Sequence, residues 1–423
     1  MVRFALLAIV LSGCDFVTNT LTSSFQTNDF SGDPYPIFVD SSSGGIVLGM
    51  REGTTDHTAV LDVLSPLTLI DRGPDTPISK TERDLTILGE RGPGGTADLP
   101  RARIPSKSTI TLHPCGSTSC AIGRTDDPRF FDAVFGLDTF AGDALRLRLG
   151  SDEIFVLPDI AGSEVHRTRS CDAVFPQPYR GGGTLILGGT EVGFSNFRIA
   201  IDTCIAPKVA NTTTQNQRGV DALLVASTAL GPTILSASTY ERYHQFDPTT
   251  PELAALPVDL VYLPSGPITG RLTDIPSIAL VGNFSGNPRA PCRQVWASHL
   301  LAAHDCEPGD DCPCGGGATY CGAPAIVELA PLARIPVLVV DDADPVLQAL
   351  RAELRPDRPE VDGILGTDAL RALELDIDYA HDRMMARCTD RTVCAARGIL
   401  DSEDRGTRFF VNGCLGDQPG PIQ

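Results

Sequence analysis

Two aspartates in this chain follow strand-like apolar segments, where a carboxyl group can be held in place for acid–base chemistry. Asp62 comes directly after Ala59-Val60-Leu61, and Asp202 follows the strand-like segment Phe197–Ile201. Two carboxyls that lie close together cannot both ionise, so they share one proton, and one can act as an acid while the other acts as a base. Alone, an aspartate at a strand end is most simply a solvated acid. We therefore ask whether the sequence supplies a second carboxyl for either residue.

An internal repeat organises the chain around these aspartates. Asp132–Phe140 (DAVFGLDTF) aligns without gaps on Asp362–Leu370 (DGILGTDAL). An alternating, strand-like segment follows each copy, at Ala144–Leu149 and at Leu373–Asp378. Glycine lets one backbone pass close to another. The two copies, called the closing motifs below, contain Gly136, Gly363 and Gly366. A repeat of this kind predicts two similar β units in one chain.

The second copy resembles the closing motif of a lobe of the pepsin- and retropepsin-like aspartic proteases. It reads I-L-G-x-D-x-L at Ile364–Leu370 and ends in an I-D-Y strand at Ile377–Tyr379. In that family each lobe also has a D-T-G-[ST] loop threaded under this segment. The resemblance covers roughly Ile37–Cys388. It implies a mainly β, bilobal, pepsin-like fold: a duplicated retropepsin-like β-lobe with short helices and a cleft between the lobes.

The resemblance places Asp62 at the first catalytic position. The apolar lead-in and Ile70, eight residues on, fit the family pattern, and Ser65 matches its fourth position. However, Val63 and Leu64 stand where the family has Thr and Gly. The bracing hydroxyl is missing and a bulky side chain replaces a glycine, so the first loop is degenerate.

The second loop departs further from the pattern. With Leu223-Leu224-Val225 as the lead-in and Ile234 as the residue eight on, Ala226 falls at the catalytic position, followed by Ser227 and Thr228. Ser227 could still brace the loops, but this alignment supplies no second carboxylate. A proton-sharing pair cannot form without one.

Asp202 is the competing partner for Asp62, because Asp202-Thr203-Cys204 differs from D-T-G by one residue. Against this, Pro207-Lys208 and a polar run follow where a buried strand is needed. A chance aspartate at a strand end is the simpler interpretation, and an Asp62–Asp202 dyad remains the alternative.

The N-terminal residues predict export and a lipid anchor. Arg3 precedes the apolar run Phe4–Leu11, and Leu11-Ser12-Gly13-Cys14 resembles a bacterial lipobox. The run is too short to span a bilayer, which takes about 20 residues. We therefore expect cleavage before Cys14 and lipidation of its thiol; an ordinary signal peptide with a chance cysteine is the alternative. The localisation expected is the cell envelope, outside the cytoplasm, with the choice of membrane left open.

Cysteine usage and charge limit the remaining functions. Of the 13 cysteines, the lipobox residue accounts for one and 12 are left, an even number that suits disulfides in an exported chain. Disulfides are therefore preferred over a metal site for the His and Cys residues between 299 and 321, and no cofactor is expected. The formal net charge of −19 disfavours binding to nucleic acid, because like charges repel.

The sequence thus predicts a membrane-anchored bacterial lipoprotein with a non-catalytic aspartic-protease-like body. Pepsin-like clefts hold extended chains by strand-type hydrogen bonding, so a peptide or protein ligand is the expected partner besides the membrane. An acid peptidase using Asp62 with an atypical partner, and a structural envelope protein, are the alternatives. The expected organisation is a signal peptide (1–14), a tether (15–34), a first lobe (35–160), a connection (161–183), a second lobe (184–397) with a Cys-rich insertion (291–321), and a tail (398–423).

Overall fold

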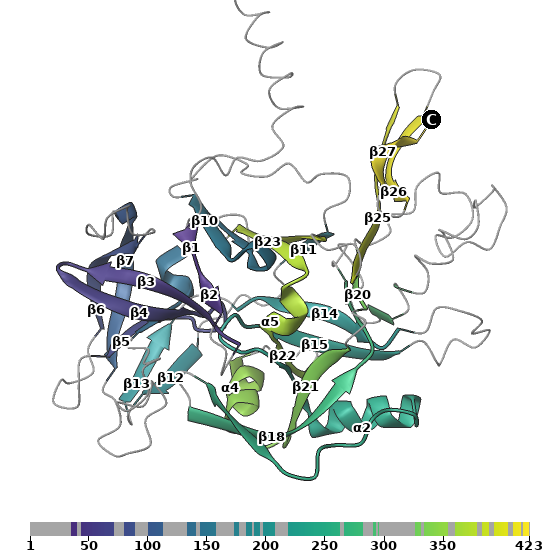
Figure 1. The fold of residues 1–423 in the computed structure, drawn as a ribbon, viewed down its shortest axis with the longest axis horizontal. Coiled ribbons are helices and arrows are strands. Elements are labelled where there is room, and N and C mark those ends of the chain that lie inside the picture. Colours follow the sequence, from purple (N-terminus) through teal and green to yellow (C-terminus); the bar gives the residue numbers. More distant parts are fainter. Residues whose placement is uncertain are drawn as a thin grey trace, which may run out of the picture.

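The computed structural model shows a mainly β protein with a few short helices (Figure 1), which confirms the predicted fold class. The described residues are 35–39, 44–71, 80–88, 100–112, 133–140, 144–157, 173–176, 183–187, 190–194, 198–207, 219–262, 266–281, 291–292, 295, 326–330, 334–353, 360–378, 383–388, 393–404, 409–415 and 418–422. Cys14, the tether and most of the Cys-rich insertion lie outside these ranges. Their predicted roles stay predictions.

The first half of the chain forms a seven-stranded sheet in the order β2-β3-β4-β8-β5-β7-β6, with β3 also pairing with β6. Its strands are β2 (Phe38–Val39), β3 (Ile46–Glu52), β4 (Thr55–Leu61), β5 (Thr68–Asp71), β6 (Lys80–Leu88), β7 (Pro100–Leu112) and β8 (Ala133–Phe135). The inner strands are covered on both faces. Ala59 and Leu61 of β4 enter one hydrophobic cluster, and Val60 between them enters another.

The second half forms a twelve-stranded sheet in the order β17-β18-β21-β16-β22-β15-β14-β19-β20-β25-β26-β27. The strands are β14 (Ala200–Ile205), β15 (Val220–Ala226), β16 (Thr233–Ser236), β17 (Val258–Tyr262), β18 (Gly266–Ile275), β19 (Ile278–Val281), β20 (Ile326–Leu329), β21 (Ile335–Val340), β22 (Gly363–Leu365), β25 (Cys394–Asp404), β26 (Phe409–Leu415) and β27 (Gln418–Ile422). The helices whose bounds are described in this half are α2 (Ala237–Phe246), α4 (Pro345–Glu353) and α5 (Thr367–Leu370). Residues from the predicted tail thus extend this sheet as strands.

Strand pairing shows the duplication directly. In the first sheet β4 is parallel to β8, β8 is antiparallel to β5, and β5 is parallel to β7. The second sheet repeats this pattern with β15, β22, β16 and β21 in the same places. The short strand of each closing motif, β8 or β22, therefore lies between the two strands that flank a candidate loop. This arrangement brings the end of each closing motif next to its loop.

The glycines of the closing motifs stand where two backbones touch. A Cβ atom at Gly363 would lie 1.9 Å from the carbonyl oxygen of Ile234, and one at Gly366 would lie 2.3 Å from that of Pro232. In the first half, a Cβ at Gly136 would lie 2.3 Å from the carbonyl oxygen of Leu67. Real side chains do not approach backbone that closely, so only glycine fits these crossings.

A third sheet joins the two halves, in the order β1-β10-β9-β23-β24-β11. Its strands are β1 (Tyr35–Pro36), β9 (Ala144–Arg148), β10 (Glu153–Leu157), β11 (Ala173–Pro176), β23 (Leu373–Asp378) and β24 (Arg383–Cys388). The halves meet where β9 pairs with β23, and there the carboxylate of Glu374 lies 3.5 Å from the Arg146 guanidinium and 2.5 Å from that of Arg148. Arg146 and Glu374 are both buried, so removing one of the two charges would leave the other uncompensated in the interior.

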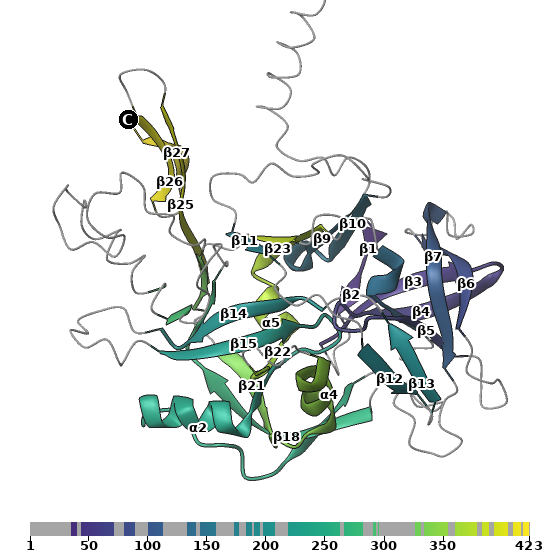
Figure 2. The ribbon, with the colours of Figure 1, turned by 180° about the vertical axis from the view of Figure 1, so that it is seen from behind.

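The ribbon seen from behind gives the same layout. The joining sheet lies along one side of the molecule and α2 and α4 lie on the other, with the second-half sheet between them (Figures 1 and 2). A separate hairpin of β12 (Gly183–Leu187) and β13 (Thr190–Phe194) lies beside the first-half sheet in both views. Of the helices in the described ranges, none is long and apolar enough to cross a membrane.

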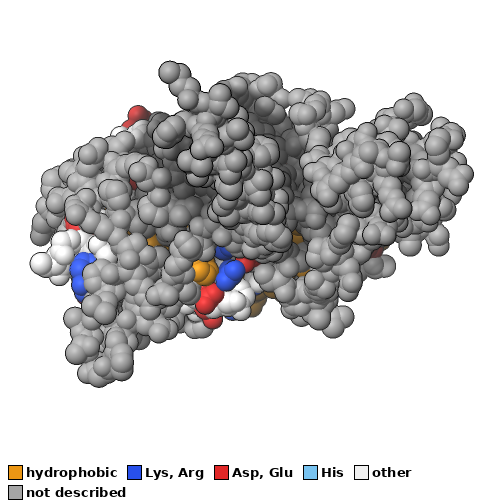
Figure 3. Space-filling view, turned by 90° about the horizontal axis from the view of Figure 1, so that it is seen from above, with side chains coloured by type: hydrophobic (Ala, Val, Ile, Leu, Met, Phe, Trp, Pro, Cys, Tyr) orange, Lys and Arg blue, Asp and Glu red, His pale blue; other side chains and the backbone are white. Residues whose placement is uncertain are grey.

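The described part of the surface is mixed in charge in the view from above. Acidic and basic side chains lie next to one another there (Figure 3).

Candidate functional site

The first candidate loop begins where β4 ends. The Asp62 amide donates a hydrogen bond to the carbonyl of Phe135 on the parallel strand β8, at 3.0 Å. The chain then turns, with the Ser65 amide donating to the Asp62 carbonyl at 3.1 Å and the Leu64 amide donating to Asp62 Oδ1 at 2.9 Å. The carboxyl group is therefore fixed by its own loop, and Asp62 is only 1% exposed.

The second candidate loop repeats these hydrogen bonds from Ser227. The Ser227 amide donates to the carbonyl of Leu365 on β22 at 2.9 Å, and the Ala229 amide donates to Ser227 Oγ at 3.2 Å. Each bond matches one made by Asp62 in the first loop. Ser227, rather than Ala226, therefore occupies the position equivalent to Asp62, and the sequence alignment must shift by one residue. Ala226 is the last residue of β15.

The two equivalent residues, Asp62 and Ser227, face each other where the first and second loops meet. This contact between the two loops is called the seam below. Ser227 Oγ donates a hydrogen bond to Asp62 Oδ1 at 3.1 Å. Both side chains are buried, at 0% and 1% exposure. The seam thus pairs one carboxyl group with one hydroxyl group, where a proton-sharing pair would need two carboxyls.

Thr228 links the two loops, because its side chain hydrogen-bonds to backbone groups of the first loop. Its Oγ1 accepts a hydrogen bond from the Val63 amide at 3.1 Å and donates one to the Leu61 carbonyl at 2.6 Å. Its own carbonyl accepts from the Ile46 amide at 2.8 Å. Val63 is the residue equivalent to Thr228 in the first loop, and valine has no hydroxyl to return the bond.

A further residue reaches the seam from the segment that leads into β14. The Arg198 guanidinium donates a hydrogen bond to the carbonyl oxygen of Leu64. Sequence reasoning missed Arg198, because a lone arginine before a strand carries no pattern. It also missed the position of Ser227, although Ser227-Thr228 at a strand end parallels Asp62-Val63 once the shift is known.

Asp202 lies inside a strand and away from Asp62. In β14 it stands opposite Leu223 of β15 and Val281 of β19. Leu223 precedes Ser227 by four residues, which corresponds to about 13 Å along a strand. The alternative dyad of Asp62 with Asp202 is therefore not formed in this structure.

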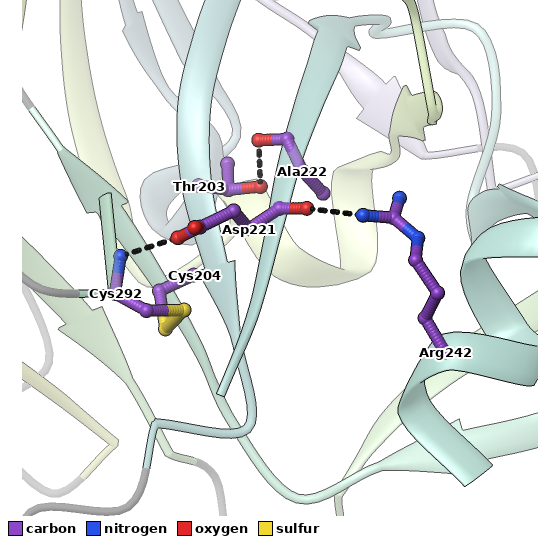
Figure 4. Close-up of a disulfide and its surroundings, with 6 residues drawn as sticks. All are labelled: Thr203, Cys204, Asp221, Ala222, Arg242 and Cys292. Atoms are coloured by element: carbon purple, nitrogen blue, oxygen red, sulfur yellow. Dashed lines mark hydrogen bonds between the residues drawn. A yellow bond between two sulfur atoms is a disulfide. The ribbon is translucent and has the colours of Figure 1, made fainter. Parts of the chain in front are cut away.

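The Asp202-Thr203-Cys204 segment serves a different purpose. Cys204 forms a disulfide with Cys292, at the start of the predicted Cys-rich insertion, and Thr203 Oγ1 donates to the Ala222 carbonyl at 2.9 Å (Figure 4). The residue that would be glycine in D-T-G is thus a disulfide cysteine on β14. Cys394 is also disulfide-bonded.

Asp221 lies beside this disulfide, and its carboxylate accepts a hydrogen bond from the Cys292 amide at 2.7 Å (Figure 4). Partial burial raises the pKa of the Asp221 carboxyl, although the Cys292 amide and the positive charge of Arg242 act in the opposite direction. The hydrogen bond anchors the start of the insertion to β15. Asp221 therefore has a structural role.

A metal site needs several His, Cys, Asp or Glu side chains close together. In the part of the chain that the structure describes, no three such side chains come together in a way that could hold a metal ion. Most of the His and Cys residues between 299 and 321 lie outside that part.

Comparison with known proteins finds structural neighbours at low similarity and no family. No protein-family model matches the chain, and no curated protein matches it. Among solved structures, the aspartic proteinase from Irpex lacteus is 11% identical with a TM-score of 0.38, and the match covers 85% of this chain and 98% of that one. Basic 7S globulin from soybean is 11% identical with a TM-score of 0.40, and the match covers 84% of this chain and 94% of that one. By its own structure the chain is a mainly β protein with two similar sheets joined by a third, and these solved structures are its neighbours at low similarity.

Proposed function

We propose that this protein is a non-catalytic, lipid-anchored envelope protein whose aspartic-protease-like body serves as a binding or structural module. One observation carries the proposal: Ser227 stands at the place equivalent to Asp62 and donates a hydrogen bond to its carboxyl group at 3.1 Å. The position that would hold the second acid in a peptidase of this type holds an alcohol.

The chemistry of the Asp62–Ser227 pair is unsuited to peptide hydrolysis. In an aspartic peptidase two carboxyls share one proton, so that one removes a proton from water while the other protonates the substrate. A serine hydroxyl cannot take the place of the second carboxyl, because it does not ionise near neutral or acidic pH. Here the hydroxyl instead satisfies the buried carboxyl of Asp62, which must be hydrogen-bonded to be tolerated in the interior.

The burial of the seam helps to decide whether a ligand would bind at the seam itself. Asp62 and Ser227 are enclosed, and Val63, Leu64 and Leu230 around them are buried as well. This fits a seam that works as a junction between the halves. A peptide or protein ligand, held by strand-type backbone hydrogen bonds, would then contact surfaces outside the Asp62–Ser227 pair.

Export and anchoring belong to the same proposal. The Cys204–Cys292 disulfide favours an oxidising compartment outside the cytoplasm. The lipobox-like Leu11-Ser12-Gly13-Cys14 supports a lipid anchor. Fractionation of cells expressing the full chain tests the anchor: the wild type should sediment with membranes and Cys14→Ser should not. Membrane association that survives Cys14→Ser would overturn this part.

A cleavage assay tests the non-catalytic part. The purified protein is incubated with casein at about pH 3–5, where a carboxyl pair can share a proton. We expect no cleavage above that of Asp62→Asn, the matched control, which removes the ionisable group and keeps the shape of the side chain. Cleavage by the wild type that Asp62→Asn abolishes would show a working acid peptidase and refute the proposal.

A further inference from the structure

Of the two equivalent residues Thr228 and Val63, only Thr228 has a side chain that can hydrogen-bond to the opposite loop. The Thr228 hydroxyl serves two backbone groups of the first loop, the Val63 amide and the Leu61 carbonyl. The repeat places Val63 where it would serve the second loop in the same way, but valine offers neither a donor nor an acceptor. Half of the side-chain brace that the duplicated backbone could carry is therefore missing.

Two other side chains of the second half contact the first loop. Ser227 Oγ donates to Asp62 Oδ1, and the Arg198 guanidinium donates to the Leu64 carbonyl. The Leu64 amide in turn donates to Asp62 Oδ1. The backbone of Leu64 is thus held at both ends, by the Asp62 carboxyl on one side and by Arg198 on the other.

Arg198 suits this task by its chemistry and its place. Its side chain is partly buried. A guanidinium stays charged there and offers several hydrogen-bond donors, whereas a lysine ammonium is more strongly hydrated and loses more on burial. It lies just before β14, the strand that pairs with β15, and β15 leads into Ser227. The backbone carbonyl of Ile199, the next residue, accepts from the Ala226 amide at 2.8 Å. Arg198 is therefore tied to the second loop while its side chain reaches the first.

We propose that Arg198 is a positioning residue that links the first loop to the second half, in place of the link between the loops that Val63 cannot supply. It holds the Leu64 peptide so that the Leu64 amide stays on the Asp62 carboxyl, and it thereby keeps Asp62 aimed at Ser227. This proposal goes beyond the proposed function, since it concerns how the seam is held and does not depend on whether the seam is catalytic.

Hydrogen exchange of the Leu64 amide, followed in peptides covering residues 57–70, tests the proposal. In Arg198→Met we expect the exchange of this segment to accelerate by about tenfold or more, because a charged hydrogen bond to a buried carbonyl is lost. Arg351→Met is the matched control: Arg351 also donates to backbone carbonyls, those of Val361 and Asp342, but within the second half. It should leave residues 57–70 unchanged.

A rescue variant separates positioning from general stability. Val63→Thr adds the missing hydroxyl, so exchange in Val63→Thr/Arg198→Met should slow towards the wild-type rate. Should Arg198→Met not fold, the same comparison with Arg198→Lys decides the matter. Unchanged exchange without Arg198, an equal effect of Arg351→Met on residues 57–70, or failure of Val63→Thr to rescue would each refute the assignment.

Discussion

Replacing Thr228 by valine tests the idea that the seam is a structural junction. Valine has nearly the shape of threonine, so Thr228→Val removes the hydroxyl without leaving a cavity. Thr228 is fully buried, and its Oγ1 accepts from the Val63 amide at 3.1 Å and donates to the Leu61 carbonyl at 2.6 Å. The variant therefore takes a hydrogen-bond partner from two backbone groups that belong to the other half of the protein.

The expected loss of stability follows from those two groups. A buried backbone donor or acceptor left without a partner costs about 1–3 kcal/mol. For the amide of Val63 and the carbonyl of Leu61 together, we expect the free energy of unfolding to fall by about 2–6 kcal/mol. Thr203→Val provides the matched control. Thr203 is also fully buried, but its Oγ1 makes one hydrogen bond, to the Ala222 carbonyl at 2.9 Å, and should cost about 1 kcal/mol.

Equilibrium unfolding in urea, followed by circular dichroism, measures both variants. The midpoint should fall further for Thr228→Val than for Thr203→Val, with similar slopes, because the surface exposed on unfolding is nearly the same. If the two variants lose the same free energy, the Thr228 hydroxyl does no more than an ordinary buried hydroxyl. The view of the seam as a junction between the halves would then be refuted.

Three further predictions concern the joining sheet and the second half. Glu374→Gln removes the negative charge that the buried Arg146 faces, and should lower stability by about 3 kcal/mol in the same urea assay. Replacing both Cys204 and Cys292 by serine opens a link between residues 88 positions apart, and should cost about 4 kcal/mol in urea under non-reducing conditions; dithiothreitol should then have less effect than on the wild type. The folded-state pKa of Asp221 is raised above 3.8, so its contribution to stability is full below that pH and is lost as the pH rises through the folded-state pKa. Asp221→Asn should therefore be more stable than the wild type at pH 7 and lose this advantage below pH 3.8. Melting temperatures measured across this pH range test the prediction.

Much of the fold could be predicted from the sequence because the closing motifs leave no choice of residue. Gly366 can only be glycine where the chain crosses the Pro232 carbonyl, and such constraints make two copies of one motif recognisable. α4 (Pro345–Glu353) is a second case, because its apolar residues repeat at helical spacing and the sequence pattern alone predicts a helix there. The helical spacing acts within a few residues and can be read directly, whereas the glycine crossings join distant residues and become recognisable because the motif occurs twice.

The register of the second loop could not be predicted, and the reason is physical. β15 is covered on both faces: Leu224 and Ala226 enter one hydrophobic cluster while Leu223 and Val225 enter the other. A strand buried on both faces is an unbroken apolar run, so its sequence does not show which residue is the last. Only pairing with β22 settles this and places Ser227 opposite Asp62. Arg198 escaped notice for a similar reason, because its partner is a backbone carbonyl in the other half.

The side chains of the seam differ between the halves in a way that bears on its purpose. The duplicated backbones keep matching hydrogen bonds at Asp62 and at Ser227. A shared-proton reaction needs the same acidic group from both halves, because each carboxyl sets the protonation of the other. A junction needs a donor on one side and an acceptor on the other. Ser227 donates to Asp62 and Thr228 donates to the Leu61 carbonyl, so at these two contacts a donor of the second half meets an acceptor of the first.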